Sequence, residues 1–198
     1  MKSSGSKAGA RRIATRADSR SPEVSVTAAP RGLKQAMIDA ARAALLARRY
    51  HRGRLHVAVI GAAEMRRQHA RWMDDDTPTD VLTFDLRDEP ERGLVDGELL
   101  VCSTVARERA RGYGGDWRAE LLLYVVHGCM HLCGLDDHDP VEAARMHRLE
   151  DRVLKQLGWG EVYAAERRAE RSRVGLTRRA EGRKKSTPPS NRKNRKKK

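Results

Sequence analysis

Residues 127–139 read HGCMHLCGLDDHD, and the pattern of this stretch organises the rest of the chain. His127 and His131 are four positions apart, so on an α-helix both imidazoles project from one face, about one turn apart. A neutral imidazole is a good zinc ligand, and this spacing lets two ring nitrogens reach one ion. The alternative is a pair of hydrogen-bonded core histidines, but the glycine and acidic residues that follow favour a metal.

Position 128 separates this pattern from that of the zinc peptidases. Peptidases of the H-E-x-x-H type carry a glutamate directly after the first histidine, where it acts as general base. Here that position is Gly128. The sequence therefore predicts a metal site without the peptidase base, and a metallopeptidase is the weaker alternative.

The segment before the histidines predicts a buried helix. Asp116 is a good N-cap residue, and the following leucines and valines are apolar on nearly every side of a helix. Strands and helices alternate around it, which indicates an α+β domain. Helices are expected near 33–49, 62–72, 103–112 and 140–157, and strands near 54–60, 81–86 and 97–102.

The charge of the chain is concentrated in its two ends. The 198 residues carry a formal charge of +14. Residues 1–30 hold six Lys/Arg against two Asp/Glu, and residues 160–198 hold fifteen against four, so 31–159 carry only −1. We expect a disordered basic N-terminal extension over 1–30, a globular domain over 31–159 and a disordered basic tail over 160–198. The tail is interpreted either as a solubilising segment or as an arm that binds polyanions.

Composition also bounds the environment of the protein. The three cysteines are odd in number and no secretion signal precedes them. We therefore expect no disulfide framework, and we expect the protein to be in a reducing cytoplasm. No segment approaches the roughly 18 apolar residues of a membrane span, so no membrane partner is expected.

Four separate motifs resemble one protein family. HGCMHLCGLDD resembles the H-G-x-L-H-L-x-G-x-D-H signature of the YbeY endoribonucleases, also called rRNA maturation factors. Residues 78–84 (PTDVLTF), 97–102 (GELLVC) and 118–126 resemble further family motifs in the same order, and the resemblance spans roughly 55–157.

The resemblance implies a small mixed β-sheet packed around a central buried helix that carries a zinc site, with one Zn²⁺ per chain. It also implies a single-strand-specific endoribonuclease that acts in rRNA maturation, at the 3′ end of 16S rRNA, and in ribosome quality control. The implied partners are single-stranded RNA, rRNA and the small ribosomal subunit. His127 and His131 would be both metal ligands and catalytic residues.

The third ligand departs from the family pattern. The family has a histidine six residues after the second ligand, where this chain has Asp137, with His138 one place later. Met146 lies nine residues after Asp137, as in the family, which favours Asp137, while a one-residue shift of the loop would deliver His138. Asp136 is expected to accept a hydrogen bond from a ligand histidine or to cap the turn.

A second departure concerns the family arginine near the scissile phosphate, whose position is Met73 here. Arg71 is the candidate replacement, with Arg66, Arg67 and His69 on the same segment, although all could be ordinary solvated side chains. The missing arginine keeps a second hypothesis open: a non-catalytic ribosome assembly factor with a structural zinc.

Overall fold

The computed structural model describes residues 21–172. Its strands are β1 (Glu23–Thr27), β2 (Arg52–Ile60), β3 (Val81–Asp85) and β4 (Leu94–Cys102). Its labelled helices are α1 (Lys34–Ala47), α2 (Ala62–Met73), α3 (Ser103–Tyr113), α4 (Trp117–Leu132) and α5 (Pro140–Gln156). One further helix covers 162–172.

The four strands form one mixed sheet in the order β1-β2-β4-β3. β1 and β4 both run parallel to β2, whereas β3 pairs antiparallel with β4. In β2 the alternate residues Leu55, Val57 and Val59 are buried, as expected for strands that face the core on one side. The mixed sheet confirms the predicted α+β class.

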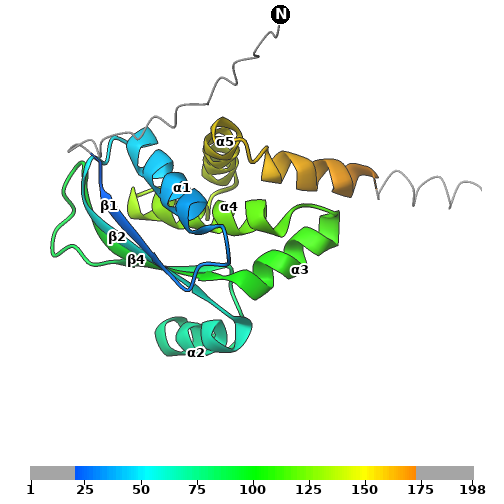
Figure 1. Cartoon of the computed structure of the whole chain (residues 1–198), viewed down its shortest axis with the longest axis horizontal. Coiled ribbons are helices and arrows are strands. Elements are labelled where there is room, and N and C mark those ends of the chain that lie inside the picture. Colours follow the sequence, from blue (N-terminus) through cyan, green and yellow to red (C-terminus); the bar gives the residue numbers. More distant parts are fainter. Residues whose placement is uncertain (1–20, 173–198) are drawn as a thin grey trace, which may run out of the picture.

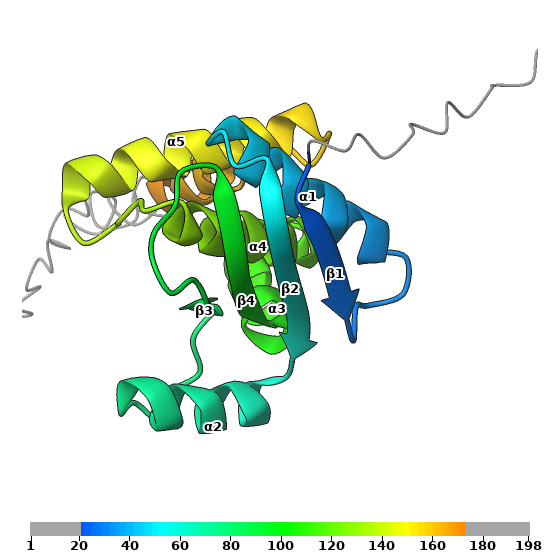
Figure 2. The ribbon, with the colours of Figure 1, turned by 90° about the vertical axis from the view of Figure 1, so that its left-hand side faces the viewer.

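Helix α4 lies at the centre of the core. Figure 1 shows α1, α4 and α5 on one side of the sheet and α2 on the other. Figure 2, turned by 90°, shows α4 crossing behind the strands. Twelve of the sixteen residues of α4 are buried, so the helix is apolar on nearly every side because neighbours cover nearly every side. Asp116 accepts a hydrogen bond from the Arg118 backbone N–H, which confirms it as the N-cap.

A glycine contact explains how closely α4 approaches the sheet. A Cβ at Gly128 would lie 2.7 Å from a Leu99 methyl group on β4 and 3.2 Å from Thr83 Oγ1 on β3. Residue 128 therefore faces the strands. A glutamate at this position would meet packed side chains, so the absence of the peptidase glutamate follows from the packing of α4.

The folded part extends beyond the predicted boundaries at both ends. Strand β1 lies within the segment 1–30, which was expected to be disordered; its Val24 and Val26 are buried, and it pairs with β2. Residues 1–20 of that segment lie outside the described residues.

The predicted tail 160–198 likewise begins with helix 162–172. The buried carboxylate of Asp151 accepts hydrogen bonds from the backbone N–H groups of Tyr163 and Ala164, at 3.0 and 3.1 Å. These bonds satisfy donors in the first turn of the helix. The remainder of the tail prediction, 173–198, lies outside the described residues.

Two simpler expectations can also be compared with the structure. Within residues 21–172, no helix is both long and apolar enough to cross a bilayer. Cys102, Cys129 and Cys133 are buried free thiols. Burial raises the pKa of Cys133 to about 12, so this thiol stays protonated at neutral pH.

Candidate metal centre

The last two turns of α4 bring the two predicted imidazoles together. Nε2 of His127 lies 3.0 Å from Nε2 of His131, and the two rings are nearly perpendicular. Both side chains remain partly open to solvent, with His127 12% and His131 28% exposed. The i, i+4 spacing therefore places two ring nitrogens at one accessible point, as predicted.

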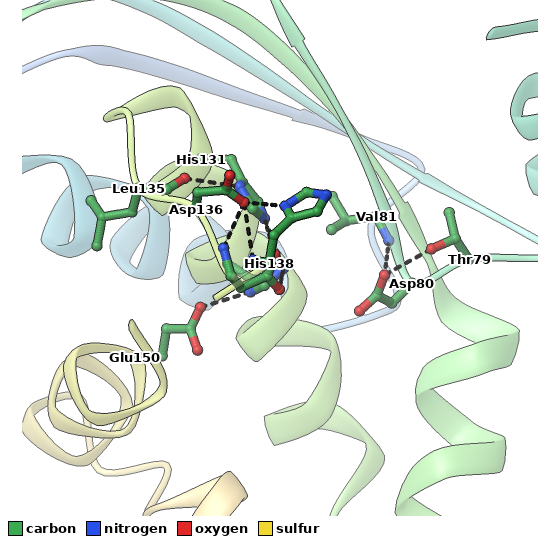
Figure 3. Close-up of polar contacts among 10 residues, drawn as sticks. Thr79, Asp80, Val81, His131, Leu135, Asp136, His138 and Glu150 are labelled. Carbon is green, nitrogen blue, oxygen red and sulfur yellow. Dashed lines mark hydrogen bonds and ion pairs between the residues drawn. The ribbon is translucent and has the colours of Figure 1, made fainter. Parts of the chain in front are cut away.

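The other nitrogen of each ring has its own partner. Nδ1 of His127 lies 2.8 Å from Oε1 of Glu150 on α5. Nδ1 of His131 lies 3.1 Å from the backbone carbonyl of Leu135, just beyond the end of α4 (Figure 3). A carbonyl oxygen can only accept, so His131 carries its proton on Nδ1, and the Glu150 carboxylate favours the same tautomer for His127.

These tautomers test whether the residues fit a metal. With both protons on Nδ1, the two Nε2 atoms face each other at 3.0 Å with a lone pair each. Two acceptors at this distance repel unless a cation or a shared proton lies between them. Histidine ligands of metals commonly donate their other N–H to a carboxylate or a backbone carbonyl, which is the arrangement found here. The donor set fits a divalent metal.

Asp137 completes the group. Its Oδ2 lies 3.6 Å from Nε2 of His127, and its Oδ1 lies 3.9 Å from Nε2 of His131. One ligand atom from each of the three residues lies within 4.8 Å of the other two. His127, His131 and Asp137 therefore form a group that could bind a metal.

His138 takes a different position. Its side chain is 88% exposed, and its Nδ1 pairs with the carboxylate of Asp136. This hydrogen bond raises the pKa of His138 and lowers the pKa of Asp136. Asp136 also accepts from the backbone N–H groups of Asp137 and His138, so it caps the turn that presents Asp137. Figure 3 shows His138 and Asp136 together on this turn.

Buried and half-buried carboxylates surround the first histidine. Burial lowers the pKa of His127, but the hydrogen bond that its ring donates to Glu150 and the charges of Glu150, Asp80 and Asp137 outweigh burial, and the pKa is raised. Glu150 is fully buried, and its Oε2 has no hydrogen-bond partner among the described residues. The environment therefore favours positive charge at the imidazole pair, in the form of a proton or a metal ion.

Arg87 fixes the end of the helix that carries the site. Its guanidinium, 8% exposed, donates to the Leu132 carbonyl at 3.1 Å, to the Leu94 carbonyl at 3.0 Å and to Asp85 at 2.8 Å. The last carbonyls of a helix have no intrahelical partner, and a cation there is favourable. Arg87 thus ties the C-terminal end of α4 to the loop between β3 and β4.

The predicted arginine does not join this group. Arg71 lies near the end of α2, is exposed, and has its guanidinium 5.1 Å from the centre of the Trp72 ring. No hydrogen bond or ion pair among residues 21–172 links it to His127, His131 or Asp137. Arg67 pairs with Glu64 on α2.

His69, on the same helix as Arg71, has a structural partner. Its Nδ1 bonds to the Thr77 carbonyl at 2.7 Å and so holds the loop after α2. The structure therefore gives His69 a local contact within this part of the chain.

Sequence reasoning missed two members of the site. Glu150 lies within the quoted helix HRLEDRVL and Asp80 within PTDVLTF, but neither was assigned a role. Glu150 could have been identified as a charged residue on the apolar face of an amphipathic helix. Asp80 accepts from Thr79 Oγ1 and from the Val81 N–H, and Figure 3 shows it across His138 from Glu150.

The sequence is similar to one family of known proteins. The sequence model of the family described as Endoribonuclease YbeY matches residues 16–158. The Endoribonuclease YbeY of Mycobacterium ulcerans is 35% identical over 130 residues, which cover 60% of this chain and 73% of that protein. That of Beutenbergia cavernae is 38% identical over 132 residues, covering 59% and 87%.

The fold has a counterpart among solved structures. The solution structure of TM1509 from Thermotoga maritima superposes with a TM-score of 0.50 at 23% identity, covering 68% of this chain and 91% of that one. At this identity the similarity concerns the fold alone. Because the family model spans well over half of the sequence, this chain belongs to the YbeY family.

Proposed function

We propose that this chain is a zinc-dependent endoribonuclease that cleaves single-stranded RNA. It would act in the cytoplasm in rRNA maturation, at the 3′ end of 16S rRNA, and in ribosome quality control. Its partners would be rRNA and the small ribosomal subunit. The proposal is supported by membership of a family described as Endoribonuclease YbeY and by the His–His–Asp group.

The observation that carries the proposal is the convergence of His127, His131 and Asp137 on one partly open point. Three protein ligands with a further position free are typical of catalytic zinc, whereas structural zinc usually has four protein ligands. Zinc held by these three residues would supply a Lewis acid for polarising a phosphoryl oxygen.

The chain's own residues prepare this point. Glu150 and the Leu135 carbonyl hold both imidazoles with Nε2 turned toward Asp137. The buried helix α4 and the bonds of Arg87 keep the histidines in place, so little reorganisation is needed when a substrate arrives. Asp137, one-third exposed on its turn, leaves the site accessible to an RNA strand.

Cleavage of a defined single-stranded RNA by the purified chain tests the proposal. We expect cleavage that stops with chelator, returns with zinc, and is absent in His131→Ala. A duplex of the same sequence should be cut far more slowly. No zinc-dependent cleavage of rRNA 3′-end sequences by metal-loaded protein would refute the enzymatic proposal.

A second candidate function, a non-catalytic assembly factor with a structural zinc, is favoured by one observation. Met73 replaces the family arginine and is 65% exposed, and Arg71 lies over Trp72 rather than at the site. In that case zinc-loaded protein would bind ribosomal subunits without cleaving RNA. Because there would be no cleavage to lose, His131→Ala would only lower the stability of the protein.

A further inference from the structure

An arginine-lined groove lies beside the end of α4. It has a volume of about 1050 Å³ and is bordered by the turn between α1 and β2 and by the loop that enters β4. In Figure 2 these two connections lie side by side at the upper end of the sheet. We call it the arginine groove, and its defining residues are Arg48, Arg49, Tyr50, Arg52, Arg92 and Cys133.

The two walls are joined by backbone bonds. The N–H groups of His51 and Arg52 donate to the Gly93 carbonyl at 2.9 and 3.1 Å. Gly93 has φ +79°, and a Cβ there would lie 3.2 Å from the Arg49 carbonyl, so the close approach favours glycine. The groove is therefore formed by the fold itself and needs no ligand to assemble it.

Its positive charge is largely unmatched. Arg48, Arg49 and Arg92 have no carboxylate within 4.0 Å in the part of the chain that the structure describes. Arg52 pairs with Glu91 at 2.6 Å, but both side chains are more than half exposed. Nε of Arg48 is buried, and among residues 21–172 it has no hydrogen-bond partner. Three guanidinium groups are thus available to an anion.

Arg49 occupies a backbone conformation that suits glycine. It follows the C-cap of α1 with φ +65°, the left-handed position at which helices commonly end in glycine. An arginine there is less stable than a glycine would be. Strain of this kind is typical of positions kept for function.

The groove and the metal-binding group share the C-terminal end of α4. Cys133 lines the groove and follows His131 by two residues, so on a helix the two side chains point to nearly opposite faces. A strand bound at His131 would therefore have to pass around this end of α4 to reach the arginines. Guanidinium groups bind phosphate oxygens well, in a planar, two-pronged geometry.

We propose that the arginine groove binds backbone phosphates of single-stranded RNA. The identity of the ligand rests on the proposed function. The groove itself rests on its unmatched arginines and preformed walls.

The test compares two doubly substituted full-length chains. Arg49→Gly/Arg92→Ala removes two groove charges, and Arg31→Ala/Arg152→Ala removes two exposed arginines elsewhere. Binding of a short fluorescent single-stranded RNA is titrated across salt concentrations, with the protein as purified and with chelator. Each phosphate contact with a single strand contributes about 0.7 to the salt slope. We expect the groove variant to lose about 1.4 from the slope and about 25-fold in affinity at 0.1 M salt, and the control variant to lose neither.

Stability distinguishes lost contacts from lost structure. Arg49→Gly alone should raise Tm because it relieves the left-handed arginine, while it weakens RNA binding about 5-fold. Equal affinity and slope in the groove and control variants would overturn the proposal. It would also be overturned if the groove variant lost affinity for an oligoglutamate peptide as strongly as for RNA, because the groove would then suit acidic proteins.

Failure of the proposed function gives a different result. If zinc-loaded protein bound RNA through the groove but did not cleave it, the enzymatic proposal would fall and the groove would stand. If the wild type cleaved RNA while the groove variant bound RNA normally, the enzymatic proposal would stand and the groove proposal would fall.

Discussion

The carboxylate of Glu150 lies 2.8 Å from Nδ1 of His127, although the two residues are 23 positions apart and belong to different helices. Glu150 is fully buried. A buried carboxylate needs a partner, and here the partner is an imidazole of the metal-binding group. The packing of α5 on α4 therefore fixes the ring that the site uses.

Replacing Glu150 by glutamine should weaken zinc binding without unfolding the protein. Gln keeps the size of the side chain but removes the charge that favours a cation at His127. Partners in this position typically change metal affinity by about 10–100-fold. Competition with a zinc chelator measures the effect. Glu108→Gln, an exposed position on α3, is the control and should bind zinc as the wild type does. Unchanged affinity in Glu150→Gln would show that the contact is only structural.

The identity of the third ligand is tested by changes at two adjacent positions. Asp137→Ala should lower zinc affinity by more than about 100-fold, because it removes a residue that would bind the metal directly. This loss exceeds the one expected for a residue that only hydrogen-bonds a ligand, as Glu150 does. His138→Ala should leave affinity unchanged, since its 88% exposed ring pairs with Asp136. Asp137→His should retain zinc. The opposite ranking of the two alanine variants in a metal titration would assign the ligand to His138.

The histidine pair and its glycine stop could be read from local spacing alone, because i, i+4 geometry is a property of one helix. Register from Met146 favoured Asp137 over His138, and the structure places Asp137 with the histidines. Glu150 could not be assigned a partner in this way, because its contact depends on how α5 packs across α4. Arg71 was chosen only because it is close in sequence to position 73, and it lies over Trp72.

Gly128 should resist substitution although helices disfavour glycine. In open helix positions Ala is better than Gly by about 1 kcal/mol. At Gly128 the new methyl group would meet Leu99 at 2.7 Å, and overpacking of this kind costs about 1–3 kcal/mol. We expect Gly128→Ala to lower the free energy of unfolding in urea.

The matched control for this prediction is Gly112 on α3. A Cβ at Gly112 would meet nothing within 4 Å, so Gly112→Ala should stabilise the protein by about 0.5–1 kcal/mol. Equal stabilisation by both substitutions would show that α4 can move away from the sheet at no cost.

Most helices and strands could be predicted from the spacing of apolar residues, but the first strand and the last helix could not. Strand β1 has only two buried valines within a charged segment, and its stability comes from pairing with residues 54–58. The alternation in Glu23–Thr27 was the available signal. Helix 162–172 carries one buried valine, Val162, and depends on Asp151, eleven or more residues earlier, to accept its first N–H groups. Contacts distant in sequence decided both cases.

Removing residues 173–198 should weaken RNA binding while leaving the fold intact. These residues hold twelve Lys/Arg against one Glu, the whole +11 of the 160–198 tail. Truncation after Ser172 keeps Val162 and the bonds to Asp151, whereas truncation at 160 would remove both. We expect weaker binding and a flatter salt dependence, measured with the same fluorescent RNA. An unchanged salt slope would leave the tail as a solubilising segment.

Stability should depend on pH through Glu120, which is 1% exposed. Burial raises the pKa of Glu120, although the hydrogen bond from Tyr113 at 2.7 Å and the charge of Arg109 lower it. Since the folded pKa lies above the unfolded value of about 4.3, the folded state binds more protons between the two values. Its contribution to stability is therefore present at low pH and lost as pH rises through the folded pKa.

The measurement is the difference in free energy of unfolding between the wild type and Glu120→Gln across acidic to neutral pH. The wild type should lose stability relative to the variant as pH rises, because the variant cannot ionise. Tyr113→Phe removes a hydrogen bond that lowers the pKa of Glu120, so in that background the loss should extend to higher pH. A wild type that gained stability relative to Glu120→Gln as pH rose would show that Arg109 outweighs burial, and that this carboxyl is held as a stabilising anion in the core.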